Sequence, residues 1–257
     1  MGMKLPTEDS EVVTDIGKST MLLYGPPKHG KSTIVSSFPG VLFAAAEEGL
    51  NHIKCRKVGI GKWEDFEELA ELLITDKHDY RTLAIDTASA LFAMCEEYTC
   101  KKLGIDHPSD ENWGKGWKAL RGNFHNPIRK LAVPMKSGKT RIGLVFVGHD
   151  KQVEVKGRIT KTSRTACDLS GTARKVLLPL VDIIGYCGFR LDASGEATQE
   201  RVVHFKGSET VEAGDRTSKL PDWVTMTKER WYTDKLQPAF DHAEELAPVR
   251  RPKKLLA

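Results

Sequence analysis

Short apolar runs alternate with amphipathic stretches along most of this chain. The runs at 20–24, 41–46, 82–86 and 142–148 are nearly free of polar residues. Continuous apolar runs of this length are typical of strands buried on both faces. Because helical stretches separate them, the pattern predicts an α/β fold with a mostly parallel sheet flanked by helices.

Amphipathic spacing predicts where the helices lie. Residues 62–75 place Trp63, Phe66 and Leu69 on one side and several glutamates elsewhere, as in a helix with one buried face. A short helix is expected from Gly30 to about residue 37, and one of about 16 residues from Ala88. Further helices are expected at 116–133 and 234–246.

The pattern changes toward the end of the chain. Ile183 to Leu191 and Arg201 to Phe205 read as two strands, joined by the turn-forming sequence 192–196. This predicts an antiparallel C-terminal hairpin. We expect three parts: a lead-in at 1–19, a core at 20–225, and a C-terminal helix with a basic tail at 226–257.

Composition indicates a globular protein away from membranes. The chain has 257 residues, 40% of them hydrophobic and 29% charged, which is ordinary for a globular domain. No apolar run approaches the roughly 20 residues that span a bilayer, and the first residues lack the apolar segment of a signal peptide. The five cysteines form no CxxC pair, so we expect buried free thiols and a cytoplasmic protein.

A phosphate-binding motif follows the first apolar run. In such a motif backbone amides surround the phosphates, Lys31 reaches the β- and γ-phosphates, and the Ser32 hydroxyl ligates Mg²⁺. The motif lies between a predicted strand and a predicted helix, as its mechanism requires. The G-x-x-x-x-G-K-[ST] pattern and the residue after it are Gly25, Pro26, Pro27, Lys28, His29, Gly30, Lys31, Ser32 and Thr33.

A carboxylate is needed on the other side of the metal. Asp86 ends the apolar run 82–86 and precedes Thr87. We interpret Asp86 as the second Mg²⁺ ligand, the alternative being a helix N-cap. Together these residues predict an ATP and Mg²⁺ site.

Three further segments, together with the phosphate-binding motif, resemble a known family of ATPases. Phe43–Leu50, Leu83–Leu91 and Val145–His149 resemble the corresponding motifs of RecA-family ATPases. With Gly214-Asp215-Arg216 and the later Leu220-Pro221, they resemble phage-encoded RecA-like ATPases of the single-strand annealing or recombinase type. The resemblance covers about 20–225 and implies a RecA-like core in a phage protein of the host cytoplasm.

The resemblance also implies catalytic roles. Glu47 would activate the attacking water, with the adjacent Glu48 as a substitute, or the pair would be a solvated loop. His149 would sense the γ-phosphate, although RecA has glutamine there; it could also be an ordinary histidine at a strand end.

Contacts to DNA are expected in the segment after His149. RecA-like proteins bind DNA there, and residues 150–175 carry an excess of positive charge, which suits a mobile phosphate-binding loop. A solvated surface loop is the alternative. The candidate DNA-binding residues are Lys151, Lys156, Arg158, Lys161 and Arg164.

A second segment, 111–125, interleaves aromatic and basic residues that could stack on bases. Trp117, Leu120 and Phe124 also follow the spacing of a helix core. We expect those three in the core and leave Trp113 open.

Neighbouring subunits of RecA-like ATPases commonly supply a basic residue to the active site. Lys206 resembles the position used in RecA, and Arg216 is a rival. Either one would make activity depend on a homo-oligomer, a ring or a filament.

The sequence hypothesis is therefore an ATP-dependent recombination protein of phage type that binds single-stranded DNA and promotes annealing or strand pairing. Its partners would be single-stranded DNA, further copies of itself, and single-strand-binding or replication proteins. A replication motor or helicase loader with the same core is an alternative. Another is a nucleotide-gated interaction protein with negligible hydrolysis.

Overall fold

A mostly parallel sheet forms the centre of the molecule. The computed structural model describes residues 15–132, 142–156 and 161–242. Among these residues the main sheet has nine strands, in the order β11-β9-β8-β1-β5-β4-β2-β3, with β10 paired to β8. The strands are β1 (Thr20–Tyr24), β2 (Val41–Ala45), β3 (Arg56–Gly59), β4 (Thr82–Asp86), β5 (Gly143–Gly148), β8 (Ile183–Leu191), β9 (Ala197–His204), β10 (Gly214–Asp215) and β11 (Trp223–Thr225).

Strand direction confirms the fold class. Strands β8, β1, β5, β4, β2 and β3 run parallel to one another. Strand β9 is antiparallel to β8, which gives the expected hairpin, and β11 is antiparallel to β9. The β1 strand is separated from β4 by β5. The end of β5 therefore lies between the loop that follows β1 and the carboxylate that ends β4.

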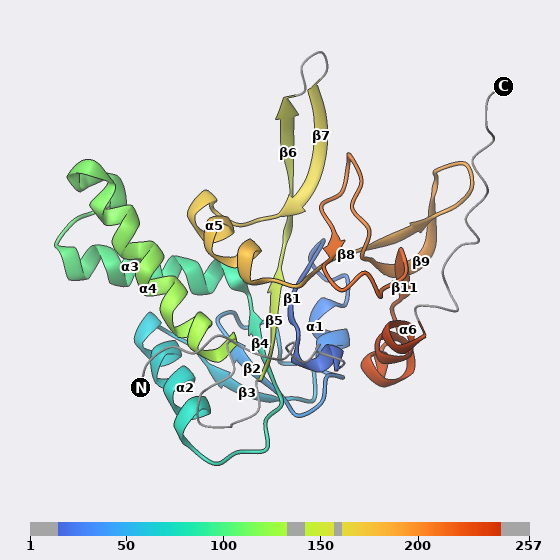
Figure 1. Cartoon of the computed structure of the whole chain (residues 1–257), viewed down its shortest axis with the longest axis horizontal. Coiled ribbons are helices and arrows are strands. Elements are labelled where there is room, and N and C mark those ends of the chain that lie inside the picture. Colours follow the sequence, from blue (N-terminus) through green and yellow to red (C-terminus); the bar gives the residue numbers. More distant parts are fainter. Residues whose placement is uncertain (1–14, 133–141, 157–160, 243–257) are drawn as a thin grey trace, which may run out of the picture.

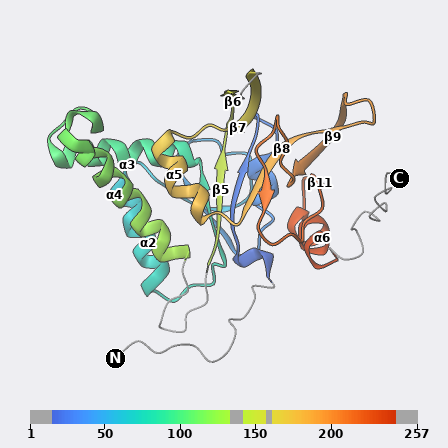
Figure 2. The same cartoon turned by 45° about the horizontal axis from the view of Figure 1, so that its top comes forward.

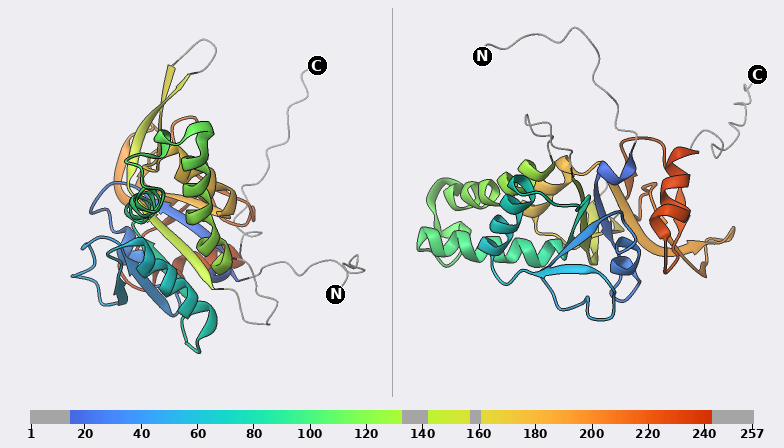
Figure 3. Two further views of the ribbon diagram at one scale, coloured as in Figure 1. Left: turned by 90° about the vertical axis from the view of Figure 1, so that its left-hand side faces the viewer. Right: turned by 90° about the horizontal axis from the view of Figure 1, so that it is seen from below.

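Helices cover both faces of this sheet (Figure 2). The α2, α3, α4 and α5 helices lie on one face and α1 and α6 on the other, with the 3₁₀ turn Ile16–Lys18 and the π turn Tyr232–Leu236 beside α6. The view from below in Figure 3 separates the two groups clearly. The helices are α1 (Lys31–Val35), α2 (Trp63–Thr75), α3 (Ala88–Leu103), α4 (Lys115–Ala132), α5 (Gly171–Leu180) and α6 (Gln237–Asp241).

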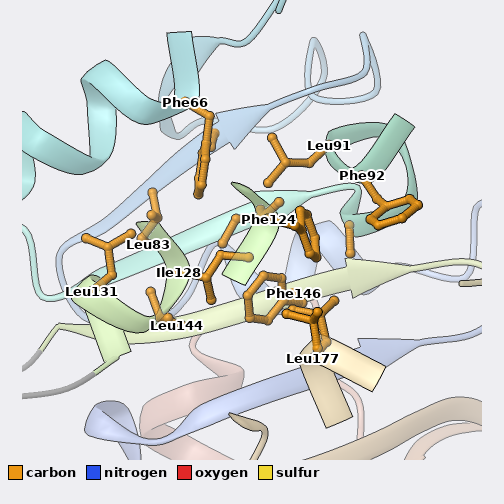
Figure 4. Packing of buried hydrophobic residues seen from close by; sticks show 14 of the residues in the cluster. Phe66, Leu83, Leu91, Phe92, Phe124, Ile128, Leu131, Leu144, Phe146 and Leu177 are labelled. Atoms are coloured by element: carbon orange, nitrogen blue, oxygen red, sulfur yellow. The ribbon is translucent and has the colours of Figure 1, made fainter. Parts of the chain in front are cut away.

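Alternate residues of each central strand enter two separate cores, because side chains on a strand point to opposite faces. In β1, Leu22 packs toward α4 and Leu23 toward α1. Figure 4 shows the α2–α5 core, where Phe124 and Ile128 of α4 lie over Phe146 of β5. Leu120 and Phe124 are fully buried, as expected, while Trp117 packs at the core's margin.

Trp113, left open by the sequence, is 97% exposed on the turn that enters α4. Four of the five cysteines are buried and Cys55 is half-buried; all five are free thiols. The predicted helix at 234–246 is a π turn followed by α6, and its last residues lie outside the described part of the chain.

The prediction of a mobile loop at 150–175 is wrong. The chain forms a two-stranded antiparallel arm of β6 (Asp150–Lys156) and β7 (Lys161–Cys167), followed by the start of α5. The arm stands out from the carboxyl-end side of the sheet (Figure 1, and the left view of Figure 3). Gln152, Val153, Glu154 and Val155 alternate polar and apolar residues, which is the signature of a half-exposed strand. The prediction of a loop considered only the excess of basic residues in this segment, and therefore missed the alternation that predicts a strand.

Candidate nucleotide-binding and catalytic site

The loop after β1 has the backbone that close wrapping around phosphate needs. Gly30 has φ 97° and Lys28 has φ 61°, both in the left-handed region. A side chain at Gly25 would clash with the carbonyl oxygen of Cys187 in β8. Glycine is therefore required at 25 by the close approach of β8, and at 30 by the backbone angle.

Lys31 holds its ammonium group over this loop. Its Nζ donates to the carbonyl oxygens of Gly25 and Pro26, both at 2.8 Å. The residue is only 5% exposed, and burial lowers the pKa of the ammonium group. A partly desolvated cation held at the mouth of the loop is well placed to exchange carbonyl contacts for phosphate oxygens.

Ser32 and Asp86 meet where a metal would bind. The Ser32 hydroxyl donates to Asp86 Oδ2 at 2.6 Å. Asp86 is 8% exposed, and burial raises the pKa of its carboxyl group while the Ser32 hydrogen bond opposes the rise. Two oxygens this close suit Mg²⁺, which takes oxygen ligands from one or two carboxylates together with phosphates. No group of three or more His, Cys, Asp or Glu side chains in the described residues could hold a metal.

Glu47, which follows β2, is tied to the residue after Asp86. Its Oε1 accepts a hydrogen bond from the Thr87 hydroxyl at 2.6 Å, and its Oε2 lies 3.9 Å from Nε2 of His149. Its side chain is 45% exposed, so water has access to the carboxylate. Glu48 is exposed and has no hydrogen bond or ion pair with any residue that the structure describes. Glu47 therefore lies in contact with Thr87 and His149 and Glu48 does not, while the water-orienting role stays a prediction.

His149 directly follows β5 and faces Glu47 between the Lys31 and Asp86 sides of the site. Its Nδ1 is buried and has no hydrogen-bond partner among the described residues. Its carbonyl oxygen accepts from the backbone N–H of Asp168, the residue that directly follows β7. His149 thus connects the polar site to both strands of the arm.

The other side of the loop is apolar. His29 is 5% exposed, and its Nε2 lies 3.0 Å from the carbonyl oxygen of Gly188. Its ring meets the ring of Phe189 edge-to-face, with the centroids 4.9 Å apart. His29 therefore fixes the loop against β8.

The candidate DNA-binding residues are distributed unevenly along the arm. Lys151 sits at its base, where Nζ pairs with Asp168 Oδ1 at 3.0 Å and donates to the Leu169 carbonyl. Arg164 is half-buried. Lys156 and Lys161 are register partners at the far end of the arm. Arg158 lies outside the described residues.

The two candidates for a residue acting on a neighbouring subunit both have contacts within this chain. Lys206 Nζ pairs with Asp222 at 3.2 Å, and the Lys206 side chain is 69% exposed. Arg216 donates to the Pro179 carbonyl at 3.0 Å, at the end of α5. Lys206 is therefore the freer of the two, and the role in a neighbour's site stays a prediction.

Sequence reasoning missed Thr87 and Tyr24. The Thr87 hydroxyl holds Glu47, and the Asp86–Thr87 peptide bond is cis. Tyr24, the residue before the loop, donates to the carbonyls of Glu212 at 2.6 Å and Thr165 at 3.1 Å. Neither contact has a local signal, because the partners are 40 to 188 residues away in sequence.

The fold and site define the chain as a P-loop nucleotide-binding protein: a phosphate-binding loop after β1, a carboxylate at the end of β4, and a mostly parallel sheet with helices on both faces. A family model described as an AAA domain matches residues 17–217. The chain belongs to this AAA-domain family of P-loop ATPases. No curated protein matches it. Within its described residues, no helix has both the length and the apolar character to cross a bilayer.

Proposed function

We propose that this protein is an ATP- and Mg²⁺-dependent ATPase of phage recombination that binds single-stranded DNA and promotes annealing or strand pairing. ATP would be held by the P-loop, with its terminal phosphate toward Glu47, Asp86 and His149. The observation that supports DNA control is the direct continuation of His149 into β6 of the arm. His149, beside the terminal phosphate, would then be joined directly along the chain to the arm that binds DNA.

The chemistry follows from the residues of the site. Glu47 has one oxygen held by Thr87 and the other facing His149, so its carboxylate can accept a proton from an attacking water. Ser32 and Asp86 would hold Mg²⁺, which supplies charge neutralisation at the phosphates when bound. Lys31 would leave the Gly25 and Pro26 carbonyls for phosphate oxygens.

The arm supports DNA binding at its far end more than at its base. Lys151 is already paired at the base, whereas the register partners Lys156 and Lys161 flank the arm's tip. Two lysines at the end of a projecting ribbon suit contact with phosphates. We place the proposed DNA contact there, and propose that the active form is a homo-oligomer, a ring or filament, in which Lys206 reaches a neighbour's site.

The test is the ATPase rate measured without DNA, with single-stranded DNA and with duplex DNA. We expect strong stimulation by single strands, and loss of that stimulation in a Lys156→Glu/Lys161→Glu double variant. Lys77→Glu, at an exposed position after α2, serves as the charge-matched control. Equal rates with all three additions would refute control by DNA. Stable binding to a replicative helicase, or duplex unwinding, would point to a replication role instead.

A salt series separates specific contact from bulk charge. The logarithm of the affinity for DNA falls as the logarithm of the salt concentration rises. Each phosphate contact that is lost makes this fall shallower by about 0.7 for a single strand. In the double variant the fall is expected to be shallower by about 1.4, since two contacts are removed, while Lys77→Glu leaves it unchanged. An unchanged slope in the double variant would show that the arm's tip does not bind the phosphates.

A further inference from the structure

A row of three side chains lies on the α1 face of the sheet, beside the P-loop. Phe189 of β8 is the register partner of Arg201 in β9. On the other side of β9, the backbone N–H of Met226 donates to the Arg201 carbonyl at 2.8 Å, one residue past β11. Residues directly opposite on neighbouring strands share a face. Phe189, Arg201 and Met226 therefore form one continuous surface, called here the shelf.

The shelf touches the phosphate-binding loop at two points. Phe189 packs edge-to-face on His29, with ring centroids 4.9 Å apart. The Met226 methyl group lies 3.7 Å from the position that a Cβ would take at Gly30. The shelf is thus the lateral continuation of the loop toward β9 and β11.

Two side chains of the shelf are exposed although residues of their kind are usually buried or paired. Phe189 is 41% exposed, although two residues earlier on the same face Cys187 is fully buried. Arg201 is exposed, and its side chain has no hydrogen bond or ion pair with the described residues. An open aromatic ring, a thioether and an unpaired guanidinium are the groups that stack on a planar heterocycle.

The direction of a bound triphosphate leads to the same place. Glu47 and His149 follow β2 and β5, and Asp86 ends β4; these three strands are all on one side of β1 in the sheet order. A terminal phosphate at those residues leaves the nucleoside end to extend across the loop, and β8, β9 and β11 lie on that opposite side. The shelf adjoins the loop there, with Phe189 exposed and Met226 half-buried.

We propose that the shelf binds the nucleoside of the triphosphate, with the base stacked on Phe189 and bordered by Met226 and Arg201. This inference rests on the proposed nucleotide function of the P-loop. It assigns base recognition to the C-terminal hairpin, which would make affinity for the whole nucleotide depend on residues more than 150 positions after the loop.

The experiment compares two ligands that share the phosphate chain: ATP and inorganic tripolyphosphate, each with Mg²⁺, titrated by calorimetry. Phe189→Ala is expected to weaken ATP binding about tenfold, as loss of one stacking contact does, and to leave tripolyphosphate affinity within twofold. Phe189→Tyr keeps the ring and is expected to retain ATP affinity. Leu191→Ala, at an apolar position farther along β8 that is 56% exposed, is the matched control and should change neither affinity.

The outcomes distinguish a failure of this proposal from a failure of the nucleotide-binding function on which it rests. Unchanged ATP affinity in Phe189→Ala, or an equal loss for both ligands, would overturn the shelf. A Lys31→Ala variant should lose both ligands together, because it removes a phosphate contact. If Lys31→Ala keeps both, the P-loop function fails, whatever Phe189 does. Thermal unfolding of each variant shows whether the hairpin stays folded. If Phe189→Ala unfolds, Phe189→Tyr decides the question: ATP affinity equal to that of the wild type supports the shelf, and a loss of ATP affinity with tripolyphosphate affinity retained refutes it.

Discussion

The nucleotide edge of the sheet has two unlike halves that meet at the P-loop. On the β2, β4 and β5 side lie Glu47, Asp86 and His149; Glu47 is hydrogen-bonded to Thr87 and lies 3.9 Å from His149, and Asp86 is hydrogen-bonded to Ser32. On the β8, β9 and β11 side the loop rests on Phe189, with Met226 beside Gly30. We call these the polar half and the apolar half.

The difference shows what each half can contribute. Charge that develops on a phosphate is stabilised by fixed charges and hydrogen-bond groups, which only the polar half concentrates. A planar apolar surface contributes affinity and selectivity without acting on the reacting atoms. Substitutions in the polar half should therefore change turnover, and those in the apolar half should change binding of the nucleoside alone.

The largest effect is expected where the two halves join. Lys31→Ala removes the cation that the Gly25 and Pro26 carbonyls hold at the loop. We expect nucleotide binding to fall at least about 100-fold, since a charge-assisted contact in a desolvated site is lost. Equilibrium binding of ATP measures this, with Lys77→Ala as the control. Near-normal binding with retained ATPase in Lys31→Ala would refute the assignment of the site.

Within the polar half, Asp86→Asn is expected to lower turnover by about 100-fold or more, because it removes the anionic oxygen that would face Mg²⁺. Nucleotide affinity measured without Mg²⁺ should change little. Steady-state rates across a Mg²⁺ titration provide the measurement. Asp79→Asn, which breaks only the exposed ion pair with Arg56, is expected to keep the wild-type rate. Full activity in Asp86→Asn would assign the metal to other groups.

The neighbouring carboxylates Glu47 and Glu48 form a matched pair. Glu47→Gln is expected to lower turnover about 100-fold through loss of a general base, with ATP affinity retained. Glu48→Gln should stay within twofold of wild type, since Glu48 has no contact in the described site. Single-turnover rates at saturating ATP distinguish them. The reverse order of effects would move the water-orienting role to Glu48.

The smallest effect is expected at Tyr24, which lies at the boundary of the halves. Tyr24→Phe removes the hydroxyl that bonds to Glu212 and Thr165, at a cost of about 1 kcal/mol of stability. For a chain of this size the thermal midpoint should drop by about 2–4 °C, with nucleotide affinity retained. Tyr98→Phe, where the hydroxyl only accepts from exposed Lys102, is the control. A drop no larger than that of Tyr98→Phe would show that the hydroxyl does not secure the arm.

The polar half was predictable because each of its residues follows an apolar strand. Glu47, Asp86 and His149 stand at strand ends, and parallel strands bring their carboxyl ends to one edge. The apolar half was not predictable. Phe189 is brought to the loop by the pairing of β8 with β1, and Met226 by the pairing of β9 with β8 and of β11 with β9; all of these pairings are non-local. The arm was missed for a different reason: its alternating residues were interpreted by their charge and not by their period.

The arm also has a mechanical consequence. Its strands pair over seven registers, from Asp150–Cys167 to Lys156–Lys161, a length of roughly 20 Å. Both strands are held at the base, β6 through its continuity with His149 and β7 through Tyr24 and the His149 carbonyl. If a ribbon anchored in this way moves as one body, it acts as a lever: a tilt of about 10° at the base would carry the far end through about 3.5 Å, given its length. Small rearrangements at the nucleotide would thus be magnified at the tip.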